Sequence, residues 1–204
     1  MAAMDFWVSV GSTYSYLSVM RIDAAAEAAG VAVRWRVFNV RTIMIAQDNI
    51  PFRDKPVKQA YMWRDIARRA ARHGLPVRVP APYPLPQLEL ANRVGILGLA
   101  EGWGEAYLRE TWRRWMVDGQ PAGESPNLDG TLAALGLVPR DVVAAAESRA
   151  VGEALEDATD AAMALGIFGS PSFVVGAEVF WGDDRLEDAL DWAAGRATAL
   201  PAQG

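Results

Sequence analysis

A chain of 204 residues, 51% hydrophobic and 22% charged, can bury a sizeable core and has the composition of an ordinary globular protein. Its net charge of -5 argues against nucleic acid as a partner, because binding phosphates needs a clustered basic surface. The absence of cysteine excludes disulfides, zinc–thiolate sites and CxxC redox chemistry. With His73 as the only histidine, metal sites built from histidine and Ser-His-Asp catalysis have little support, and we expect no metal.

The N-terminus carries neither a basic n-region nor a long apolar segment. No apolar run approaches the length of a membrane span. We therefore expect a cytoplasmic protein without a membrane partner.

The first forty residues predict a strand, a helix and a second strand. Residues 4–10 are rich in β-branched and aromatic side chains, as in a buried strand. Residues 14–29 carry apolar residues at helical spacing up to Gly30, a residue that commonly ends helices. Residues 31–38 alternate apolar and basic side chains, which indicates a strand with one exposed face. This order predicts a right-handed βαβ unit with parallel strands.

Between Val40 and Ala164 the pattern is helical, with almost no strand signal. Residues 76–86 are predicted to form an extended loop, because their five prolines block hydrogen bonds of both helices and sheets. We expect helices at residues 57–72, 88–100, 103–117, 128–135, 140–149 and 151–165.

The last forty residues predict a β-hairpin and a helix. Strand character at residues 172–175 and 178–181 is interrupted by the turn Gly176-Ala177. A helix follows at residues 184–194, and a frayed tail runs to Gly204. The fold class is therefore α/β, a thioredoxin-like core with the order βαβ…ββα, formed by residues 1–40 and 166–204 and interrupted by an all-helical domain at residues 41–165.

Ser12 follows the first strand directly and is predicted to lie at or next to the N-cap of the first helix. The usual role of a serine there is to cap the helix. The backbone N–H groups that follow have no partners within the helix, and the helix dipole adds partial positive charge. The alternative is that an anion, a thiolate, binds beside the Ser12 hydroxyl.

Pro171, in Gly169-Ser170-Pro171, precedes a predicted strand and must lie at its start or at a bend. An ordinary trans proline entering a strand is one interpretation. The other is a cis-proline facing the first helix, as at this topological position of thioredoxin-like folds, and the βαβ…ββα order favours it.

Five segments in order carry a resemblance that covers residues 5–196. They are Asp5-Phe-Trp with Gly11-Ser-Thr-Tyr-Ser-Tyr-Leu17, Lys58-Gln-Ala-Tyr-Met62 with Asp65, Pro80-Ala-Pro-Tyr-Pro84, Phe168-Gly-Ser-Pro-Ser-Phe173, and Phe180-Trp-Gly-Asp-Asp-Arg-Leu186. The chain resembles the 2-hydroxychromene-2-carboxylate isomerases and the kappa-class glutathione transferases, a DsbA-like branch of the thioredoxin fold. It departs from the family pattern at Thr13, Pro82 and Met44, and the last two departures bear on the substrate more than on the glutathione site.

The resemblance implies a glutathione site. Ser12 would contact the glutathione sulfur, and the Ser170 backbone beside Pro171 would pair with the cysteinyl backbone. At the γ-glutamyl end, Asp183 and Asp184 are expected, although an Asp at that point is most often an N-cap. Lys58 would pair with a glutathione carboxylate unless it is a solvated surface lysine, and Asn49 is expected to border the site. Three aromatic residues, Trp63, Tyr83 and Trp181, are candidates for an acceptor pocket or for ordinary core and surface positions.

The implied function is a glutathione-dependent isomerase in aromatic-compound catabolism, acting on a small aromatic substrate, with a homodimer implied by the same resemblance. A kappa-like glutathione transferase on another electrophile would use the same site. A redox-inactive thioredoxin-like module that binds peptides through the Pro171 loop is the alternative outside these enzymes.

Overall fold

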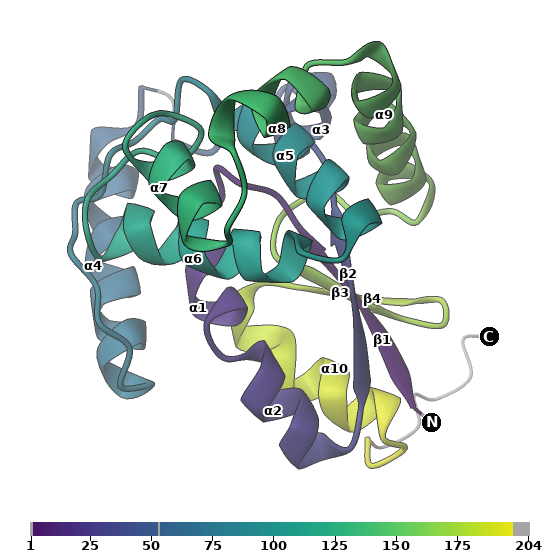
Figure 1. The fold of residues 1–204 in the computed structure, drawn as a ribbon. Coiled ribbons are helices and arrows are strands. Elements are labelled where there is room, and N and C mark those ends of the chain that lie inside the picture. Colours follow the sequence, from purple (N-terminus) through teal and green to yellow (C-terminus); the bar gives the residue numbers. More distant parts are fainter. Residues whose placement is uncertain (1, 53, 198–204) are drawn as a thin grey trace.

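The computed structural model describes residues 2–52 and 54–197, and its centre is a sheet with the strand order β2-β1-β3-β4 (Figure 1). β1 (Ala3–Val8) and β2 (Ala32–Val37) are parallel, while β3 (Ser172–Val175) is antiparallel to both β1 and β4 (Glu178–Trp181). The predicted order βαβ…ββα is confirmed, and the hairpin strands have the predicted bounds.

The alternation of apolar and basic residues in β2 reflects its two environments. Trp35 and Val37 are buried, whereas Arg34 and Arg36 are exposed. Both arginines reach Asp5 on β1, at N–O distances of 2.8 and 3.4 Å. Cross-strand pairs of opposite charge support the register of neighbouring strands.

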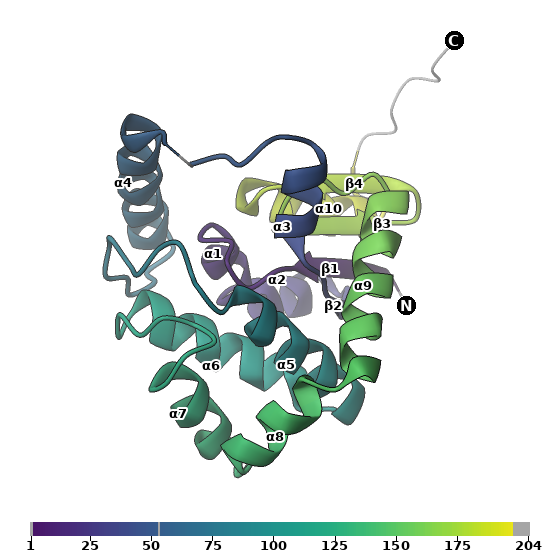
Figure 2. The same cartoon turned by 90° about the horizontal axis from the view of Figure 1, so that it is seen from above.

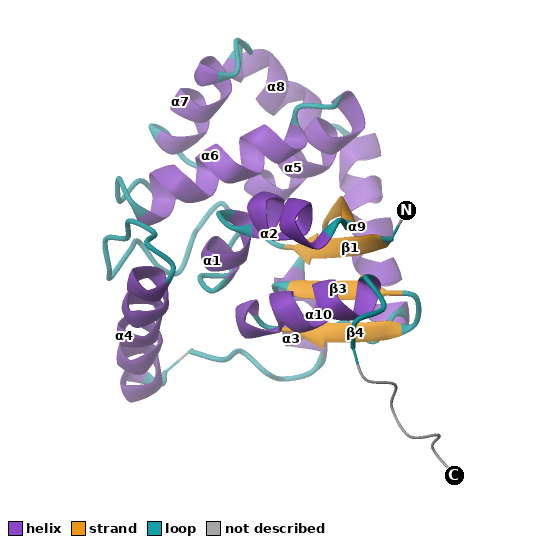
Figure 3. Cartoon of the chain, turned by 90° about the horizontal axis from the view of Figure 1, so that it is seen from below, coloured by secondary structure: helices purple, strands orange, loops and turns teal. Residues whose placement is uncertain are grey.

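One face of the sheet is covered by α2 (Ile22–Ala29) and α10 (Leu186–Ala193), which lie side by side in Figures 1 and 3. A short 3-10 helix, η1 (Asp183–Arg185), leads into α10, so the predicted final helix begins in a tighter turn. On the opposite face, the C-terminal part of α9 (Arg149–Ala164) and α3 (Val40–Ala46) pack through a second apolar cluster. Its buried members are Trp7, Phe38, Val40, Ile43, Ala162, Ile167 and Val174.

The prediction of one continuous helix at residues 14–29 is wrong. The structure has α1 (Ser15–Val19) and then α2, with turn residues between them. The backbone N–H of Arg21 donates to Ser18 O and not to the Leu17 carbonyl, as it would in a continuous helix. Arg21 Nε donates to the Leu17 carbonyl instead, at 3.3 Å. The same guanidinium reaches Glu187 at 2.5 Å, so a contact from the far end of the chain accompanies the break.

The described residues between β2 and β3 form helices and loops without a strand, as predicted for the insert. One hydrophobic core runs from Phe6 and Phe173 in the sheet to Trp112 and Leu132 in the helices. The division into two separate domains stays a prediction, and α3 lies in a segment for which no helix was predicted. Besides α3 and α9, the insert contains α4 (Pro56–Arg72), α5 (Leu88–Glu101), α6 (Gly104–Met116), α7 (Asn127–Ala134) and α8 (Pro139–Ala146), and Figure 2 shows α4 set apart from the others.

The proline-rich segment 76–86 is an extended loop, as predicted. It is held to the helices by hydrogen bonds to its backbone carbonyls, from the Tyr16 hydroxyl to Pro76 O and from Trp115 Nε1 to Pro82 O at 2.7 Å. These contacts fix the position of the loop that carries Tyr83.

The described residues contain neither a membrane-spanning helix nor a metal-binding cluster. No helix there is long and apolar enough to cross a bilayer. No group of three or more His, Asp or Glu side chains there is arranged to hold a metal ion.

The end of β1 is tied to α5 by Asn92, which is fully buried. Asn92 Oδ1 accepts the Val10 N–H at 2.8 Å, and Nδ2 donates to Val10 O at 3.0 Å and to Leu88 O at 2.7 Å. The Asn92 side chain thus makes the hydrogen bonds to Val10 that a neighbouring strand would otherwise make, two residues before Ser12.

We predict that Asn92→Ala lowers the free energy of unfolding by at least about 2 kcal/mol, because each buried group left without a partner costs about 1–3 kcal/mol. Urea titration of the variant measures the loss. Glu89→Ala, an exposed change on the same helix, is the control and should stay within about 0.5 kcal/mol of the parent. Equal stability of the two variants would contradict the role of Asn92.

Candidate functional site

Ser12 lies in the loop between β1 and α1, and both of its backbone groups are held. Its N–H donates to Ser9 O at 3.1 Å, and its carbonyl accepts from Trp112 Nε1 at 3.3 Å. The hydroxyl donates to Ser170 O at 2.6 Å. The predicted N-cap position is wrong, because the cap of α1 is Tyr14 and no side chain caps this helix.

Ser170 comes from the other end of the chain and meets Ser12 at the entry to β3. The Ser170–Pro171 peptide bond is cis, as predicted. The Ser170 hydroxyl accepts from Ser9 N at 3.0 Å and lies 2.9 Å from Ser15 Oγ. We expected the Ser170 carbonyl to be free for a peptide-like ligand, but in this structure it accepts the Ser12 hydroxyl.

A cavity of about 520 Å³ opens beside Ser12, and two of the residues predicted from the family, Asn49 and Lys58, line it. Tyr83 and Trp181 line it too, whereas Trp63 lies behind Tyr83, with ring centroids 6.0 Å apart. Among the described lining residues there are two cations and no carboxylate. The aromatic lining residues are Tyr14, Phe52, Tyr61, Tyr83, Phe168 and Trp181, and the cations are Arg41 and Lys58.

A second, smaller hollow of about 270 Å³ adjoins the first and has the opposite character. Tyr14, Ser170 and Trp181 line both spaces. The smaller hollow is also lined by Pro171, Gly182 and four charged residues, Asp65, Arg69, Asp183 and Asp184. The two spaces together therefore form an elongated site, with two cations and no described carboxylate in the larger part and three carboxylates and one arginine in the smaller.

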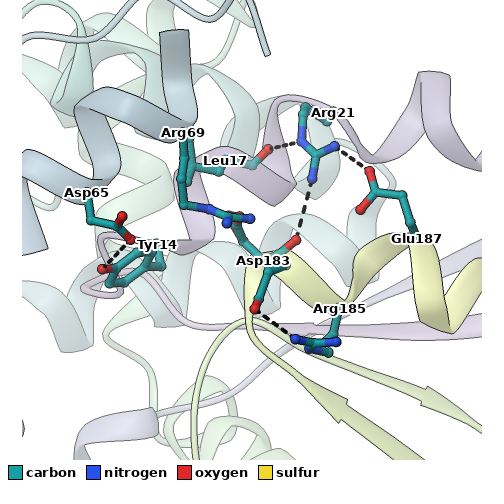
Figure 4. Close-up of polar contacts among 9 residues, drawn as sticks. Tyr14, Leu17, Arg21, Asp65, Arg69, Asp183, Arg185 and Glu187 are labelled. Carbon is teal, nitrogen blue, oxygen red and sulfur yellow. Dashed lines mark hydrogen bonds and ion pairs between the residues drawn. The ribbon is translucent and has the colours of Figure 1, made fainter. Parts of the chain in front are cut away.

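Asp183 and Asp184, the two aspartates predicted from the family resemblance, differ in their availability. Figure 4 shows Asp183 beside Arg69. The Asp183 side chain is 1% exposed, and Arg69 donates to its Oδ2 from both Nε, at 2.7 Å, and Nη2. Burial raises the pKa of the Asp183 carboxyl, and the Arg69 guanidinium opposes that shift. Asp184 is half-exposed and pairs with Arg185 at 3.1 Å. Of the two, Asp184 presents the more accessible carboxylate.

Tyr14 and Arg69 also line the smaller hollow, and neither was predicted from the sequence as a site residue. The Tyr14 hydroxyl donates to Asp65 Oδ2 at 3.1 Å. Burial raises the pKa of Tyr14, and the Asp65 carboxylate raises it further, so the phenol stays protonated at neutral pH and cannot act as a base there. Asp65 and Arg69 are four residues apart on α4, so their spacing could have indicated a shared face.

Comparisons with known proteins agree with this architecture. A family model described as "DSBA-like thioredoxin domain" matches residues 3–191. A 2-hydroxychromene-2-carboxylate isomerase of Pseudomonas putida is 29% identical over 95% of this chain and 94% of its own length. The glutathione S-transferase kappa 2 of Caenorhabditis elegans is 25% identical over 94% and 91%. A solved structure of a 2-hydroxychromene-2-carboxylate isomerase superposes with a TM-score of 0.83 at 28% identity, covering 95% of each chain.

We predict that Arg69→Met lowers the free energy of unfolding by about 3 kcal/mol at neutral pH, because it leaves the Asp183 charge buried without its main partner. A carboxyl whose pKa is higher folded than unfolded binds its proton more tightly in the folded state. The variant's deficit should therefore shrink as the pH falls. Urea unfolding at about pH 7.5 and about pH 5 measures the difference.

Arg72→Met, which removes an exposed cation from the same helix, is the control and should show little change. Adding Asp183→Asn to Arg69→Met should remove the pH dependence. A deficit of equal size at both pH values would show that Asp183 is not the group responsible.

Proposed function

The chain belongs to the family of DSBA-like thioredoxin domains, and on that premise we propose that it is a glutathione-dependent isomerase of the 2-hydroxychromene-2-carboxylate isomerase type, acting on a small aromatic substrate in aromatic-compound catabolism. The observation that carries the proposal is the Ser12 hydroxyl, which faces Ser170 O at 2.6 Å. Ser12 lines the aromatic cavity, as do Tyr14, Ser170 and Trp181, which also line the smaller hollow.

Glutathione fits the donors that surround Ser12. A cysteinyl thiol has a pKa of about 8.5, and lowering it by about two units requires about 2.7 kcal/mol of preference for the thiolate. A hydroxyl donating to an anion contributes about 1.5–3 kcal/mol. The backbone N–H groups of Thr13 and Tyr14, both in the cavity lining, make no hydrogen bond among the described residues. They are further donors for a thiolate.

The helix dipole contributes less than expected from the sequence. α1 is five residues long, and Ser12 lies outside its cap. Since the effect falls off within the first turn, the hydroxyl and the loop amides carry most of the proposed stabilisation.

The Ser12 hydroxyl has one proton and already gives it to Ser170 O. Turning that proton toward a sulfur anion leaves the Ser170 carbonyl without this donor, at a cost. The cysteinyl N–H of glutathione, which the family resemblance places against the Ser170 backbone, would replace the lost bond. Binding of the peptide backbone and release of the Ser12 hydroxyl would then be one exchange of hydrogen bonds.

The two parts of the site suit the ends of glutathione. The half-exposed Asp184 would accept from the γ-glutamyl ammonium group in the smaller hollow. Asp183 would not contact the ammonium group directly, because its carboxylate is buried and bonded to Arg69. It would contribute only its negative charge. Lys58, exposed and 5.6 Å from the Phe52 ring centroid, would pair with the glycyl carboxylate, with Asn49 near it.

When bound, glutathione supplies a thiolate that adds reversibly to a conjugated carbonyl substrate, so that a double bond becomes single, rotates and is restored. The protein's residues would orient the substrate and shield it from water. Phe168 and Trp181, with ring centroids 4.8 Å apart, and Tyr83 would hold the flat ring of the substrate. No base is required in this scheme, which agrees with the protonated state of Tyr14.

A kappa-like glutathione transferase is the second candidate, supported by the kappa-class relative. It would use the same thiolate without the elimination that returns glutathione. A redox-inactive peptide-binding module is the third, and calorimetric titration with glutathione separates it, because such a module should show no affinity for the tripeptide. A homodimer and a cytoplasmic location stay predictions.

We predict that Ser12→Ala raises the thiol pKa of bound glutathione by about one to two units, because one hydrogen bond to the anion is lost. Turnover should fall at least about tenfold while folding stays near normal. The measurements are the ultraviolet absorbance of bound thiolate against pH, steady-state turnover and urea unfolding.

Ser18→Ala is the matched control. Ser18 lies in α1, is fully buried, and its hydroxyl has no hydrogen-bond partner among the described residues. Its removal should leave the thiolate titration unchanged. Full activity and an unchanged thiol pKa in Ser12→Ala would overturn the role assigned to Ser12.

A further inference from the structure

Arg41 brings a cation into the wall of the larger cavity. It is the second residue of α3, and its backbone N–H is held at 3.1 Å by Asn39, whose side chain caps the helix. Ile43 anchors the same helix in the apolar cluster below, and Met44, one turn along, lines the cavity as well. The arginine therefore extends from a fixed element rather than from a free loop.

The guanidinium of Arg41 makes no ion pair and no hydrogen bond to any residue that the structure describes. Most described arginines pair with a carboxylate, even on the exposed surface, as Arg149 does with Glu153. Arg41 is partly buried, and the described lining of its cavity holds no carboxylate. A partly buried cation without a partner has lost part of its hydration, and an anionic ligand would offset that cost.

A donor lies close to this cation. Tyr83 lines the same cavity as Arg41. Burial raises the pKa of the Tyr83 phenol, and the charge of Arg41 opposes that shift. Tyr83 is held by edge-to-face contacts with Phe52 and Trp63, at centroid distances of 6.2 and 6.0 Å. A guanidinium and a protonated phenol in the wall of one cavity suit a carboxylate, which can accept from both.

The cavity's other cation, Lys58, is assigned to glutathione in the proposed function, on which the present inference rests. We propose that Arg41 is a specificity-determining residue that binds a negative charge on the second substrate, with Tyr83 as an additional donor. The site would then select aromatic acids over neutral aromatic compounds of the same size.

The test compares 2-naphthoate with its methyl ester, which keeps the rings but removes the charge. Calorimetric titration of the whole protein, with and without glutathione, gives the dissociation constant of each probe. We expect the unmodified protein to bind the acid about tenfold more tightly than the ester. Arg41→Met should abolish this preference by weakening the acid alone, and Arg41→Lys should retain part of it, because the charge remains while the planar fork is lost.

Arg64→Met is the control for net charge, since Arg64 is exposed on α4 and lies outside both cavity linings. It should leave the preference intact. An unchanged preference in Arg41→Met, or one abolished by Lys58→Met and not by Arg41→Met, would overturn the proposal. If the probes behave as expected but glutathione does not bind, the proposed function fails and the assignment of Arg41 stands.

Discussion

The hydrogen bond from Ser12 Oγ to Ser170 O joins two loops that are 158 residues apart and brings the candidate site together. One loop leaves the parallel strand β1, and the other enters the antiparallel strand β3 beside it. Because β1 and β3 are neighbours in the sheet, their connecting loops must meet at one edge. The sheet order therefore decides that these two serines face each other.

Buried polar side chains support this meeting from behind. Ser9 and Ser15 hold the Ser170 hydroxyl, and Asn92 holds the backbone of Val10 just before Ser12. Such groups are favourable in a core only when their hydrogen bonds are satisfied, and here they restrict the loop to one conformation. The Ser12 hydroxyl is the member of this network that a ligand could redirect.

Charge divides the site into two parts. The smaller hollow contains carboxylates, one of which is neutralised by Arg69, while the larger cavity contains cations and aromatic rings. A ligand with an ammonium group at one end and carboxylates elsewhere is complementary to this distribution. Arg41 is partly buried in the wall of the larger cavity and has no described ion-pair partner, and a charge in that position favours an anion that comes with the substrate.

The sequence by itself determined the elements whose signals are local. Alternation in β2, the prolines of residues 76–86 and the turn at Gly176-Ala177 predicted their structures correctly, because strand faces and turns depend on neighbouring residues. The resemblance of short motifs to a known family also predicted that Ser12 and Ser170 belong to one site, and the structure joins them by a hydrogen bond.

Only the tertiary structure decided which contacts the residues of the site and of its supporting helices make. α2 is separated from α1 where Arg21 reaches Glu187, and Asp183 is withdrawn from solvent because Arg69 of α4 covers it. Ser12 caps no helix and donates across the sheet edge instead. Each of these contacts joins residues more than one hundred positions apart, and the free energy of such a contact is absent from any local pattern, because it arises only when the chain has folded.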